Sequence, residues 1–239
     1  MKFSHLSRLY SNSTIVQNQV LKIEGEDFFY LKSVMRLRQN DIFRIFNEIN
    51  GEFLVKIESI DKHNINILPF EQIRIPLQEK ELILGICLIK PDRMTEAIIA
   101  SIQLGVTKII PLISERTQYK TINYQKISKC IIQAIEQCER FKPPYLLREM
   151  QLTDFCKLDN IDQIIFACES EDVAYKINNI DEIKQNVAVL IGPEGGFSEK
   201  ETAFIKSISH VNSVSLGSTV LRAETAAITA IACVQMVRT

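Results

Sequence analysis

Apolar and polar residues alternate with a two-residue period in parts of residues 1–70, a pattern typical of β-strands. Residues 41–46 and 52–58 show this alternation on either side of Asn50 and Gly51, a dipeptide that favours a tight turn. The pattern therefore predicts a β-hairpin whose strands each turn one apolar face toward a core.

A third strand is expected at residues 63–70, and a helix at residues 27–37, where apolar residues recur at helical spacing. Residues 71–80 are polar and include a proline, so we expect the first domain to end there. These patterns predict a small N-terminal β-barrel domain of residues 1–72, followed by a second domain of residues 73–239.

The second domain alternates short apolar runs with segments of helical periodicity. Strands are expected at 82–88, 106–113, 161–168, 187–191 and 211–216, and helices at 91–104, 122–140, 198–208 and 222–237. The helix at 198–208 should begin with a capping box, because Ser198 is followed three residues later by Glu201. This alternation predicts an α/β fold with a mainly parallel sheet covered by helices on both faces.

The composition is that of a protein with a substantial core, since 46% of its 239 residues are hydrophobic and its mean hydropathy is +0.03. No apolar run approaches the roughly 20 residues of a membrane span, and the N-terminus lacks the apolar stretch of a signal peptide. We therefore expect a cytoplasmic protein without a membrane segment.

Cysteine and histidine give no sign of a disulfide framework or a metal site. The six cysteines contain no C-x-x-C pair, and most lie in apolar surroundings, as reduced core cysteines do. The three histidines, His5, His63 and His210, lie far apart in the sequence and lack ligand spacing. We expect no bound metal and no Ser-His-Asp triad.

The net charge is −1, but the charges are distributed unevenly. Residues 86–150 carry 10 Lys and Arg against 6 Asp and Glu, whereas residues 151–200 carry 4 against 10. A polyanion such as RNA would contact the first of these stretches rather than the second. By charge alone, an ordinary solvated surface explains the same numbers equally well.

Two glycine-bearing segments near the C-terminus carry the strongest functional signal. The first, residues 187–201, is an apolar run that ends at G-P-E-G-G, residues 192–196, and resumes as a helix. It is neither the G-x-G-x-x-G dinucleotide fingerprint nor a P-loop. Its proline fixes one φ angle and its glycines permit unusual ones, so backbone N–H and C=O groups can face a ligand closely. Alone, such a loop is more often a simple strand-to-helix turn.

The second segment, residues 214–227, changes that balance. Leu216 and Gly217 again end a strand at the carboxyl edge of the sheet, where open α/β sheets bind ligands. Glu224 suits the start of the helix that follows, but Arg222 does not, because a cation is unfavourable in the first helical turn. We expect Arg222 to face an anionic group, such as a phosphate or a carboxylate.

At these motifs the sequence resembles the ribosomal small subunit methyltransferase E family, over nearly its whole length. The most specific matches are I-G-P-E-G-G-F-S-x-x-E at 191–201 and L-G-S-T-V-L-R-A-E-T-A at 216–226. Weaker matches are V-M-R-L-R at 34–38, K-P-D-R-M at 90–94, L-G-V at 104–106, S-E-R at 114–116 and E-Q-C-E-R at 136–140. The chain departs from the family at Tyr30, where a histidine is usual, and at Gln103, where a glutamate is usual.

The resemblance implies a PUA-like β-barrel followed by a SPOUT-class α/β methyltransferase domain with a trefoil knot, working as a homodimer. It implies S-adenosylmethionine as the cofactor and N3 of a uridine in 16S ribosomal RNA, in the small ribosomal subunit, as the methylated atom. By residue match, the cofactor pocket would consist of Ile191, Gly192, Pro193, Glu194, Gly195, Gly196, Leu216, Gly217, Leu221, Arg222 and Thr225.

Methylation at N3 needs a group that removes the uracil proton or stabilises the anion that forms. We expect Arg222 or Arg116 to stabilise the uracil oxygens. Glu224 is a candidate proton acceptor, and its alternative role is structural, as a carboxylate at a helix start. Glu194 has the same two alternatives, because it either holds its loop or meets the substrate.

Cationic side chains from both domains are expected to contact the RNA. The candidates are Arg8, Lys32, Arg36, Arg38, Arg93, Arg116 and Arg140. Lys32 and Arg36 stand four residues apart on the expected helix, a spacing suited to phosphates.

Two other functions stay open. A non-catalytic RNA-binding or ribosome assembly factor could use the same scaffold, but it would not need to keep both glycine-bearing segments. A nucleotide-dependent dehydrogenase would need a G-x-G-x-x-G turn early in the α/β domain, where Ile89, Lys90 and Pro91 stand instead. The uridine and the small ribosomal subunit come from the resemblance and not from the residue pattern.

Overall fold

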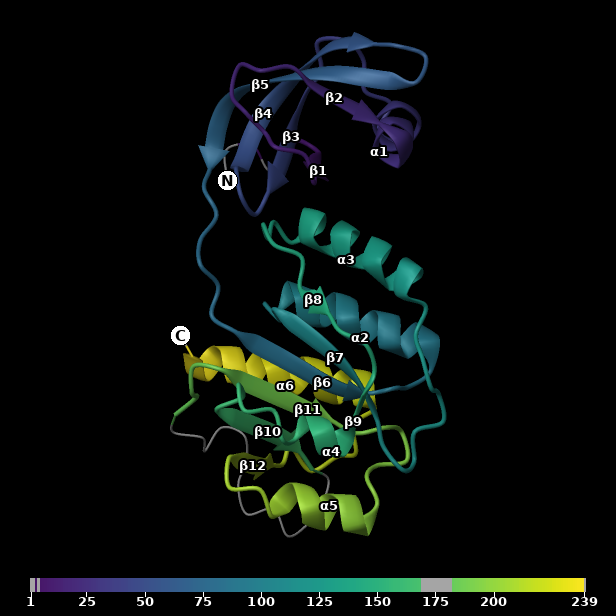
Figure 1. The fold of residues 1–239 in the computed structure, drawn as a ribbon, viewed down its shortest axis with the longest axis vertical. Helices are drawn as coiled ribbons and strands as arrows, with labels where there is room; N and C mark the ends of the chain where they lie inside the picture. Colours follow the sequence, from purple (N-terminus) through teal and green to yellow (C-terminus); the bar gives the residue numbers. More distant parts are fainter. Residues whose placement is uncertain (1–2, 4, 169–181, 239) are drawn as a thin grey trace. The chain divides into compact units, whose positions relative to one another are not determined.

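A computed structural model describes residue 3 and residues 5–168 and 182–238 of the chain (Figure 1). The chain divides into two compact units. The first unit consists of Met1–Gln78 together with Ile135–Lys142, and the second of Glu79–Ala134 and Pro143–Thr239. We call Ile135–Lys142 the returning segment, because the chain comes back to the first unit there.

The first unit contains a five-stranded sheet in the order β1-β3-β4-β5-β2, curled around its own apolar core. Its strands are β1 (Arg8–Tyr10), β2 (Leu21–Glu24), β3 (Ile42–Asn47), β4 (Gly51–Ile60) and β5 (Asn64–Arg74). The β1 strand pairs in parallel with β3, and the other neighbours pair antiparallel. The register of β4 against β5 shifts along their length, and such irregularities let a sheet curl. Fully buried side chains such as Phe43, Val55 and Ile65 fill the interior.

The expected hairpin is confirmed, because β3 pairs antiparallel along its whole length with the first half of β4. The side chain of Asn47 shapes the turn, since its Oδ1 accepts hydrogen bonds from the backbone N–H groups of Ile49 and Asn50 at 3.1 and 2.6 Å. The expected third strand is β5. The short strands β1 and β2 were not predicted, because three or four residues are too few to show a period.

The expected N-terminal helix is wrong in its extent and form. The structure has a short helix α1 (Gly25–Phe29) that continues as a π-helical turn η1 (Tyr30–Val34). Arg36 lies beyond it, with a left-handed φ of +54°. Lys32 and Arg36 therefore do not share a helix face, and the ammonium nitrogen of Lys32 lies 5.0 Å from the ring centroid of Phe28.

A cluster of charged side chains is buried in the first unit. Glu52 is fully buried and pairs with Arg8 at 2.8 Å, Arg44 at 3.2 Å and Arg74 at 3.1 Å. Glu139, from the returning segment, pairs with Arg44 at 2.9 Å and with Arg74 at 3.1 Å. Burial alone would raise the pKa of Glu139, but the hydrogen bond and charge of Arg44, with the charges of Arg74 and Arg8, lower it. These pairs hold the returning segment to the barrel.

Arg8 makes the most extensive contacts in this cluster. Its side chain is 2% exposed, and its Nη1 donates to the backbone carbonyls of Ile135 and Arg140 at 2.8 and 2.9 Å. Its guanidinium carbon lies 3.4 Å from the ring centroid of Phe46. The expected RNA contact by Arg8 is therefore wrong, because a guanidinium enclosed in this way has no surface left to offer a phosphate.

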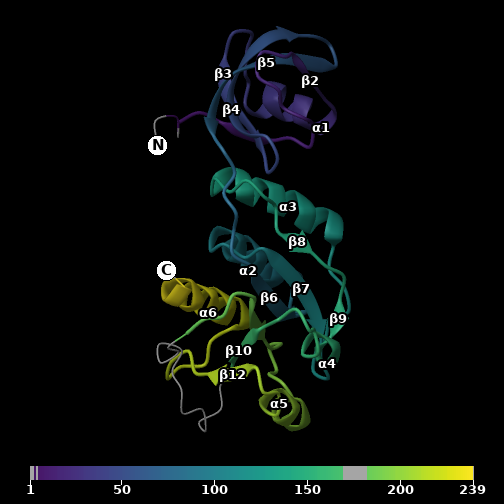
Figure 2. The same ribbon diagram turned by 60° about the vertical axis from the view of Figure 1, so that its left-hand side comes forward.

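The second unit is built on a seven-stranded sheet in the order β12-β10-β11-β6-β7-β8, with β9 beside β7 (Figure 1). Figure 2 shows the same unit turned by 60°. Its strands are β6 (Leu82–Cys87), β7 (Lys108–Ile113), β8 (Tyr145–Leu146), β9 (Met150–Gln151), β10 (Gln163–Ala167), β11 (Val187–Ile191) and β12 (Val211–Val214). Its helices are α2 (Pro91–Gln103), α4 (Leu152–Phe155), α5 (Glu199–Lys206), α6 (Ala223–Arg238) and α3 (Tyr124–Gln137), the last of which ends in the returning segment. All strand pairs of this sheet are parallel, as the alternating pattern predicts.

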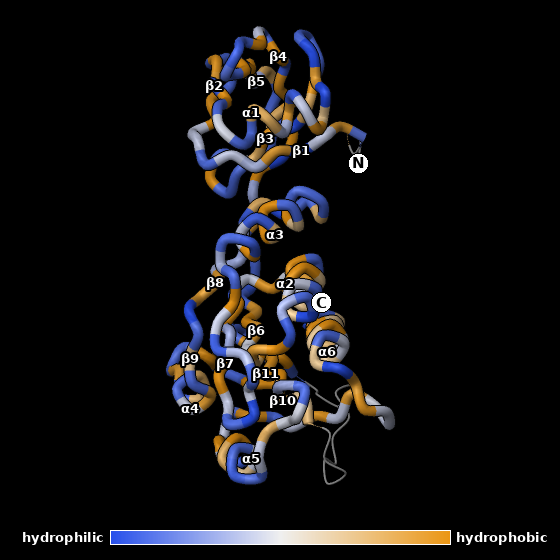
Figure 3. The backbone as a smooth tube through the Cα atoms, turned by 90° about the vertical axis from the view of Figure 1, so that its right-hand side faces the viewer, coloured by the Kyte–Doolittle hydropathy of each residue, from blue (hydrophilic) through white to orange (hydrophobic). Residues whose placement is uncertain are grey.

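Helices cover both faces of this sheet. Figure 3 shows α2 and α6 side by side on one face, while α4 and α5 lie on the other. Phe155 of α4 and Ile205 of α5 are fully buried in one apolar cluster with Ile83, Ile110 and Ile164 of the strands. Sequence periodicity predicts all these strands and helices except the short elements β8, β9 and α4.

Candidate functional site

The two glycine-bearing segments follow strands that end at the same edge of the sheet. The β11 strand ends at Ile191 and β12 at Val214, and both pair in parallel with β10, which lies between them. The segments are therefore not immediate neighbours, because the end of β10 separates them. Cys168, directly after β10, donates its backbone N–H to the carbonyl of Val214 at 3.0 Å. The sequence shows β10 as an apolar run, but it gives no signal for this strand order.

The first segment is a compact turn that leads into α5. The backbone N–H of Gly196 donates to the carbonyl of Pro193 at 2.8 Å, and Gly196 has a φ of +65°. The predicted capping box is confirmed: the N–H of Glu201 donates to the Ser198 hydroxyl at 3.2 Å, and the N–H of Ser198 donates to the Glu201 carboxylate at 3.0 Å. The ring of Phe197 packs edge-on against the buried Phe166, with centroids 5.6 Å apart.

Neighbouring loops hold this first segment from two sides. The backbone N–H of Lys90 donates to the carboxylate of Glu194 at 3.0 Å. On the other side, Arg116 donates to the carbonyl of Gly195 at 2.9 Å, and the N–H of Glu115 donates to the carboxylate of Glu201 at 2.8 Å. Of the two roles open for Glu194, this geometry supports the one in which it holds its loop.

Among the described residues, the second segment has fewer hydrogen bonds up to the start of α6. The Ser215 hydroxyl contacts the backbone of Gly217, and residues 217–220 are exposed. The first helical hydrogen bond of α6 runs from the N–H of Ala226 to the carbonyl of Arg222 at 2.8 Å. Arg222 itself is exposed, as expected of a cation that faces an external anion.

Glu224 is buried, and it forms an ion pair with Arg93 from α2. The side chain of Glu224 is 5% exposed, and its Oε1 lies 2.9 Å from Nη1 of Arg93. Arg93 also approaches Glu96 at 3.6 Å. One nitrogen of the Arg93 guanidinium is therefore bonded to Glu224, and only the rest of the group is available to RNA.

The backbone of both segments fits a ligand that approaches closely. A Cβ atom added at Gly196 or at Gly217 would meet no heavy atom within 4 Å, and one added at Gly195 would meet only the Arg116 side chain, at 3.9 Å. Gly217 has a φ of +141°, a conformation that is open to glycine and rarely to other residues. Open main chain at glycines, one of them in a conformation that other residues rarely adopt, is the arrangement expected of a cofactor cradle.

The expected cofactor residues differ in exposure. Ile191 and Pro193 are buried, Gly192, Gly196, Leu216 and Leu221 are half-buried, and Glu194, Gly195, Gly217, Arg222 and Thr225 are exposed. The buried members lie at the strand end and fix the direction of the loop. The exposed members provide groups that a ligand can reach.

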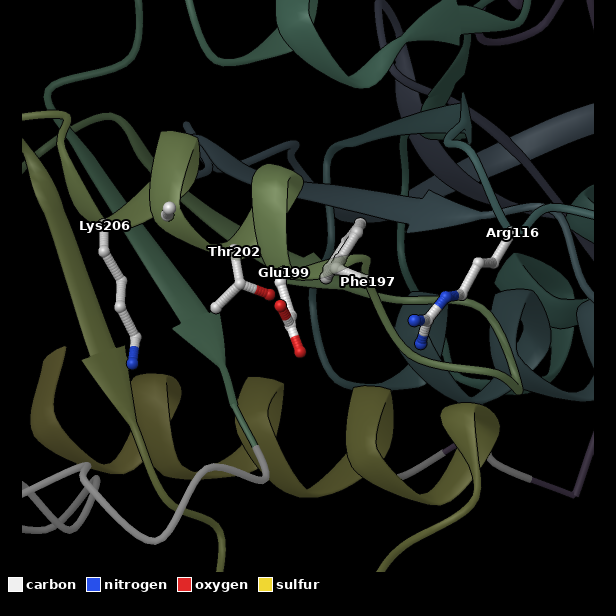
Figure 4. Close-up of a pocket in the computed structure, with 6 residues that line it drawn as sticks. Arg116, Phe197, Glu199, Thr202 and Lys206 are labelled. Atoms are coloured by element: carbon white, nitrogen blue, oxygen red, sulfur yellow. The ribbon is translucent and has the colours of Figure 1, made fainter.

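An open depression adjoins the first segment. It has a volume of about 450 Å³ and is lined by Arg116, Phe197, Glu199, Thr202, Ala203 and Lys206. Figure 4 shows that most of its labelled side chains come from α5, with Arg116 approaching from a separate loop. The α5 residues of this depression are not among the site residues predicted from the sequence. These residues follow the capped start of α5 at intervals of three to four positions. That spacing is the signal that could have placed them on one face of the helix.

The expected RNA-contacting cations belong to both units of the chain. Lys32, Arg36 and Arg38 are exposed on the first unit, and Arg116 is exposed on the second. Arg140 is half-buried, and its carbonyl accepts from Arg8.

Other chemistry has little support in the described part of the chain. Among residues 3, 5–168 and 182–238, no group of three or more His, Cys, Asp or Glu side chains could hold a metal ion. Burial raises the pKa of the Cys87 thiol to about 12, so it is neutral and unreactive at physiological pH. No helix in these described ranges is long and apolar enough to span a bilayer.

Two family models match the chain. One, described as an RNA methyltransferase domain, covers residues 76–235, and one described as an RNA methyltransferase PUA domain covers residues 23–70. The chain is 39% identical to the ribosomal RNA small subunit methyltransferase E of Rickettsia conorii, over 96% of this chain and 95% of that protein. It is 32% identical to the protein of the same name from Buchnera aphidicola subsp. Schizaphis graminum, over 97% and 96%.

Solved structures share the fold. A structure described as a methyltransferase from Legionella pneumophila in complex with the bound cofactor SAM is 30% identical, with a TM-score of 0.81 and 97% of each chain covered. Ribosomal RNA small subunit methyltransferase E from Neisseria gonorrhoeae, bound to S-adenosyl methionine, is 24% identical, with a TM-score of 0.82 over 97% of this chain and 98% of that one. The expected architecture, a PUA-like β-barrel and a SPOUT-class α/β methyltransferase domain, is confirmed.

Proposed function

Because the chain belongs to the ribosomal RNA small subunit methyltransferase E family, we propose that it methylates N3 of a uridine in 16S ribosomal RNA with S-adenosylmethionine as donor. Residues 1–72 act as the RNA-binding barrel domain, to which the returning segment adds, and the rest of residues 73–239 act as the knotted methyltransferase domain. The observation that carries the proposal is the open main chain of Gly196 and Gly217, at the ends of two parallel strands of one sheet.

The protein's main task in this reaction is to hold and orient two reactants. The bound cofactor supplies a methyl group on a sulfonium centre, which is already activated for displacement. The first and second segments hold the cofactor by backbone groups, at the residues Ile191, Gly192, Pro193, Glu194, Gly195, Gly196, Leu216, Gly217, Leu221, Arg222 and Thr225. Orienting two reactants in this way lowers a barrier by about 7–11 kcal/mol.

The target nucleotide approaches from the side of the depression beside α5. Arg116 and Lys206 line it with positive charge, and Arg116 is bonded to the first segment. As the N3 proton passes to solvent water, Arg116 and Arg222 stabilise the negative charge that develops on the uracil oxygens. Lys32, Arg36 and Arg38 contact RNA phosphates from the barrel, where all three are exposed.

The active protein is a cytoplasmic homodimer in this proposal. Supporting it, α6 carries apolar residues around its whole circumference, and such a helix is normally covered on every side. Yet Val220, just before α6, is 79% exposed, and Met236 near its end is 78% exposed. A second copy packed along α6 would cover apolar side chains of this kind, and homodimers are the commonest oligomers. Sedimentation of the purified protein measures the oligomeric state directly.

Nucleoside mass spectrometry tests the activity. We expect 16S ribosomal RNA from a deletion strain to lack N3-methyluridine at one position, and the wild-type gene to restore it. A copy encoding Arg222→Ala serves as the matched control and should restore it poorly. Unchanged methylation in the deletion strain would contradict the proposal.

Calorimetry separates the enzyme from a non-catalytic assembly factor on the same scaffold. We expect the purified protein to bind S-adenosylmethionine. If no binding is measured at millimolar cofactor, the assembly factor becomes the better interpretation.

A further inference from the structure

The short turn between β6 and α2 contacts both glycine-bearing segments. It comprises Lys90, which precedes α2, and the first helical residues up to Arg93. At its start, the backbone N–H of Lys90 donates to Glu194 of the first segment at 3.0 Å. At its end, Arg93 pairs with Glu224, two residues after Arg222 of the second segment, at 2.9 Å. All four groups lie within the second unit.

The two contacts differ in burial. Glu194 is exposed, so its bond to Lys90 competes with water. The side chain of Glu224 is 5% exposed, whereas that of Arg93 is 40% exposed. A carboxylate so far from water is costly to leave unpaired, and Arg93 is the cation that meets it. Pro91 strengthens this arrangement, because a proline at the first helical position fixes the direction in which the turn enters α2.

We propose that the turn from Lys90 to Arg93 is a brace that sets the two cofactor-binding segments at a fixed spacing. Arg93 is a positioning residue in this proposal, because it acts through Glu224 on the start of α6 and not on the cofactor or the RNA. Glu194 and Glu224 then serve as the two attachment points of the brace. In this proposal both carboxylates hold the cofactor-binding segments in place, and neither accepts the uracil proton. The inference rests on the proposed cofactor site.

Cofactor affinity is the direct measure of the brace. Removing the Arg93 guanidinium leaves the carboxylate of Glu224 buried without its cation. Either the start of α6 must then shift, or the carboxylate must take up a proton. We expect Arg93→Ala to weaken S-adenosylhomocysteine binding by about ten- to a hundredfold in calorimetry, within the range of coupling between contacting residues. Arg93→Lys, which keeps the charge, should recover part of that loss. Glu96→Gln is the matched control, because Glu96 is 58% exposed and only 3.6 Å from Arg93, and it should change the affinity less than about twofold.

A comparison of cofactor affinity with turnover separates support from proton transfer. We expect Glu224→Gln to weaken cofactor binding while turnover at saturating cofactor stays within about threefold of wild type, because the amide still accepts from Arg93. A proton acceptor would behave in the opposite way, with a steep loss of turnover at unchanged affinity, and that result would overturn the inference. Glu194→Ala, at the exposed end of the brace, provides a second variant if Arg93→Ala does not fold, and it should weaken cofactor binding by about three- to tenfold.

Binding of a 16S ribosomal RNA fragment to the cofactor-free protein distinguishes the brace from an RNA contact. We expect Arg93→Ala to leave this RNA affinity unchanged. Weakened RNA binding at unchanged cofactor affinity would overturn the inference and restore Arg93 as an RNA contact. The proposed function fails separately, if the wild-type protein itself binds no cofactor.

Discussion

The two glycine-bearing segments occupy equivalent places at the ends of parallel strands, but the protein holds them very differently. The first is fixed at Glu194, Gly195 and Glu201 by hydrogen bonds from two other loops, and its helix starts with a complete capping box. Within the described part of the chain, the second has a local contact between Ser215 and Gly217, and its residues 217–220 are exposed. We therefore expect one wall of the proposed cofactor site to be rigid and the other to adjust.

This difference suggests that the two segments have different roles in cofactor binding. A preformed wall binds without an ordering cost, whereas an adjustable one must lose conformational freedom when the ligand arrives. An adjustable wall also lets a ligand enter a site that main chain surrounds on several sides. The same substitution should therefore have different consequences in the two segments.

The largest effect is expected from Gly196→Val. The valine side chain would project into the open space beside the first segment, where we place the cofactor, so affinity should fall by more than about a hundredfold. The positive φ of Gly196 also strains any other residue, at a cost of about 1–2 kcal/mol. Calorimetry measures the affinity, and thermal unfolding should show a Tm lower by about 2–8 °C.

The control for this variant is Gly196→Asn, because asparagine tolerates a left-handed conformation better than valine does. It should recover much of the stability and little of the affinity. Full affinity in Gly196→Val would remove the first segment from the cofactor site.

A smaller effect is expected from Gly217→Ala. Its φ of +141° would strain an alanine in a fixed loop, but the second segment can relax. We expect cofactor affinity to fall by about tenfold while Tm changes by less than about 2 °C. A Tm loss as large as that of Gly196→Val would show that both walls are equally rigid.

Arg116→Ala should act mainly on the reaction with RNA. Its guanidinium lines the depression and donates one exposed hydrogen bond to Gly195. We expect turnover on ribosomal RNA to fall by about tenfold and cofactor affinity by about threefold, as for the loss of one exposed charged hydrogen bond. Lys120→Ala, on the loop that follows, is the matched control. An unaltered rate would remove Arg116 from the mechanism.

The smallest effect on binding is expected from Ser198→Ala, which removes half of the capping box. Such a change costs about 1 kcal/mol of stability, measurable as a lower Tm. Cofactor affinity should change by less than about twofold, because Glu194 and Gly195 are still held from the neighbouring loops. Hydrogen exchange completes the comparison: in the free protein, residues 216–222 should exchange faster than residues 192–197, and cofactor should slow the former more.

Local patterns in the sequence predict much of the fold. The strands β6, β7, β10, β11 and β12 and the helices α2, α5 and α6 lie where the apolar period places them, because each buries one face or a whole short run. The capping box at Ser198 and the turn at Asn50 could also be predicted, because each depends on residues only a few positions apart.

Contacts between residues far apart in the sequence could not be predicted from local patterns. The position of β10 between β11 and β12 depends on strand order, which no local period encodes. Arg8 looks like any surface cation in the sequence, and its burial follows from Glu52 and from carbonyls more than a hundred residues away. The pairing of Arg93 with Glu224 is equally hidden in the sequence, because the two residues lie 131 positions apart.

The returning segment limits how this barrel can be handled as a separate piece. A fragment that stops at Gln78 would keep Arg8, Arg44 and Arg74 around Glu52, but it would lose Glu139 and the carbonyls that Arg8 donates to. Three cations would then share one enclosed carboxylate, an arrangement that strongly disfavours folding. A barrel that can be moved to another protein would need residues 135–142 joined to it by an engineered linker. A gene fusion cut near Gln78 would therefore yield a barrel without its returning segment.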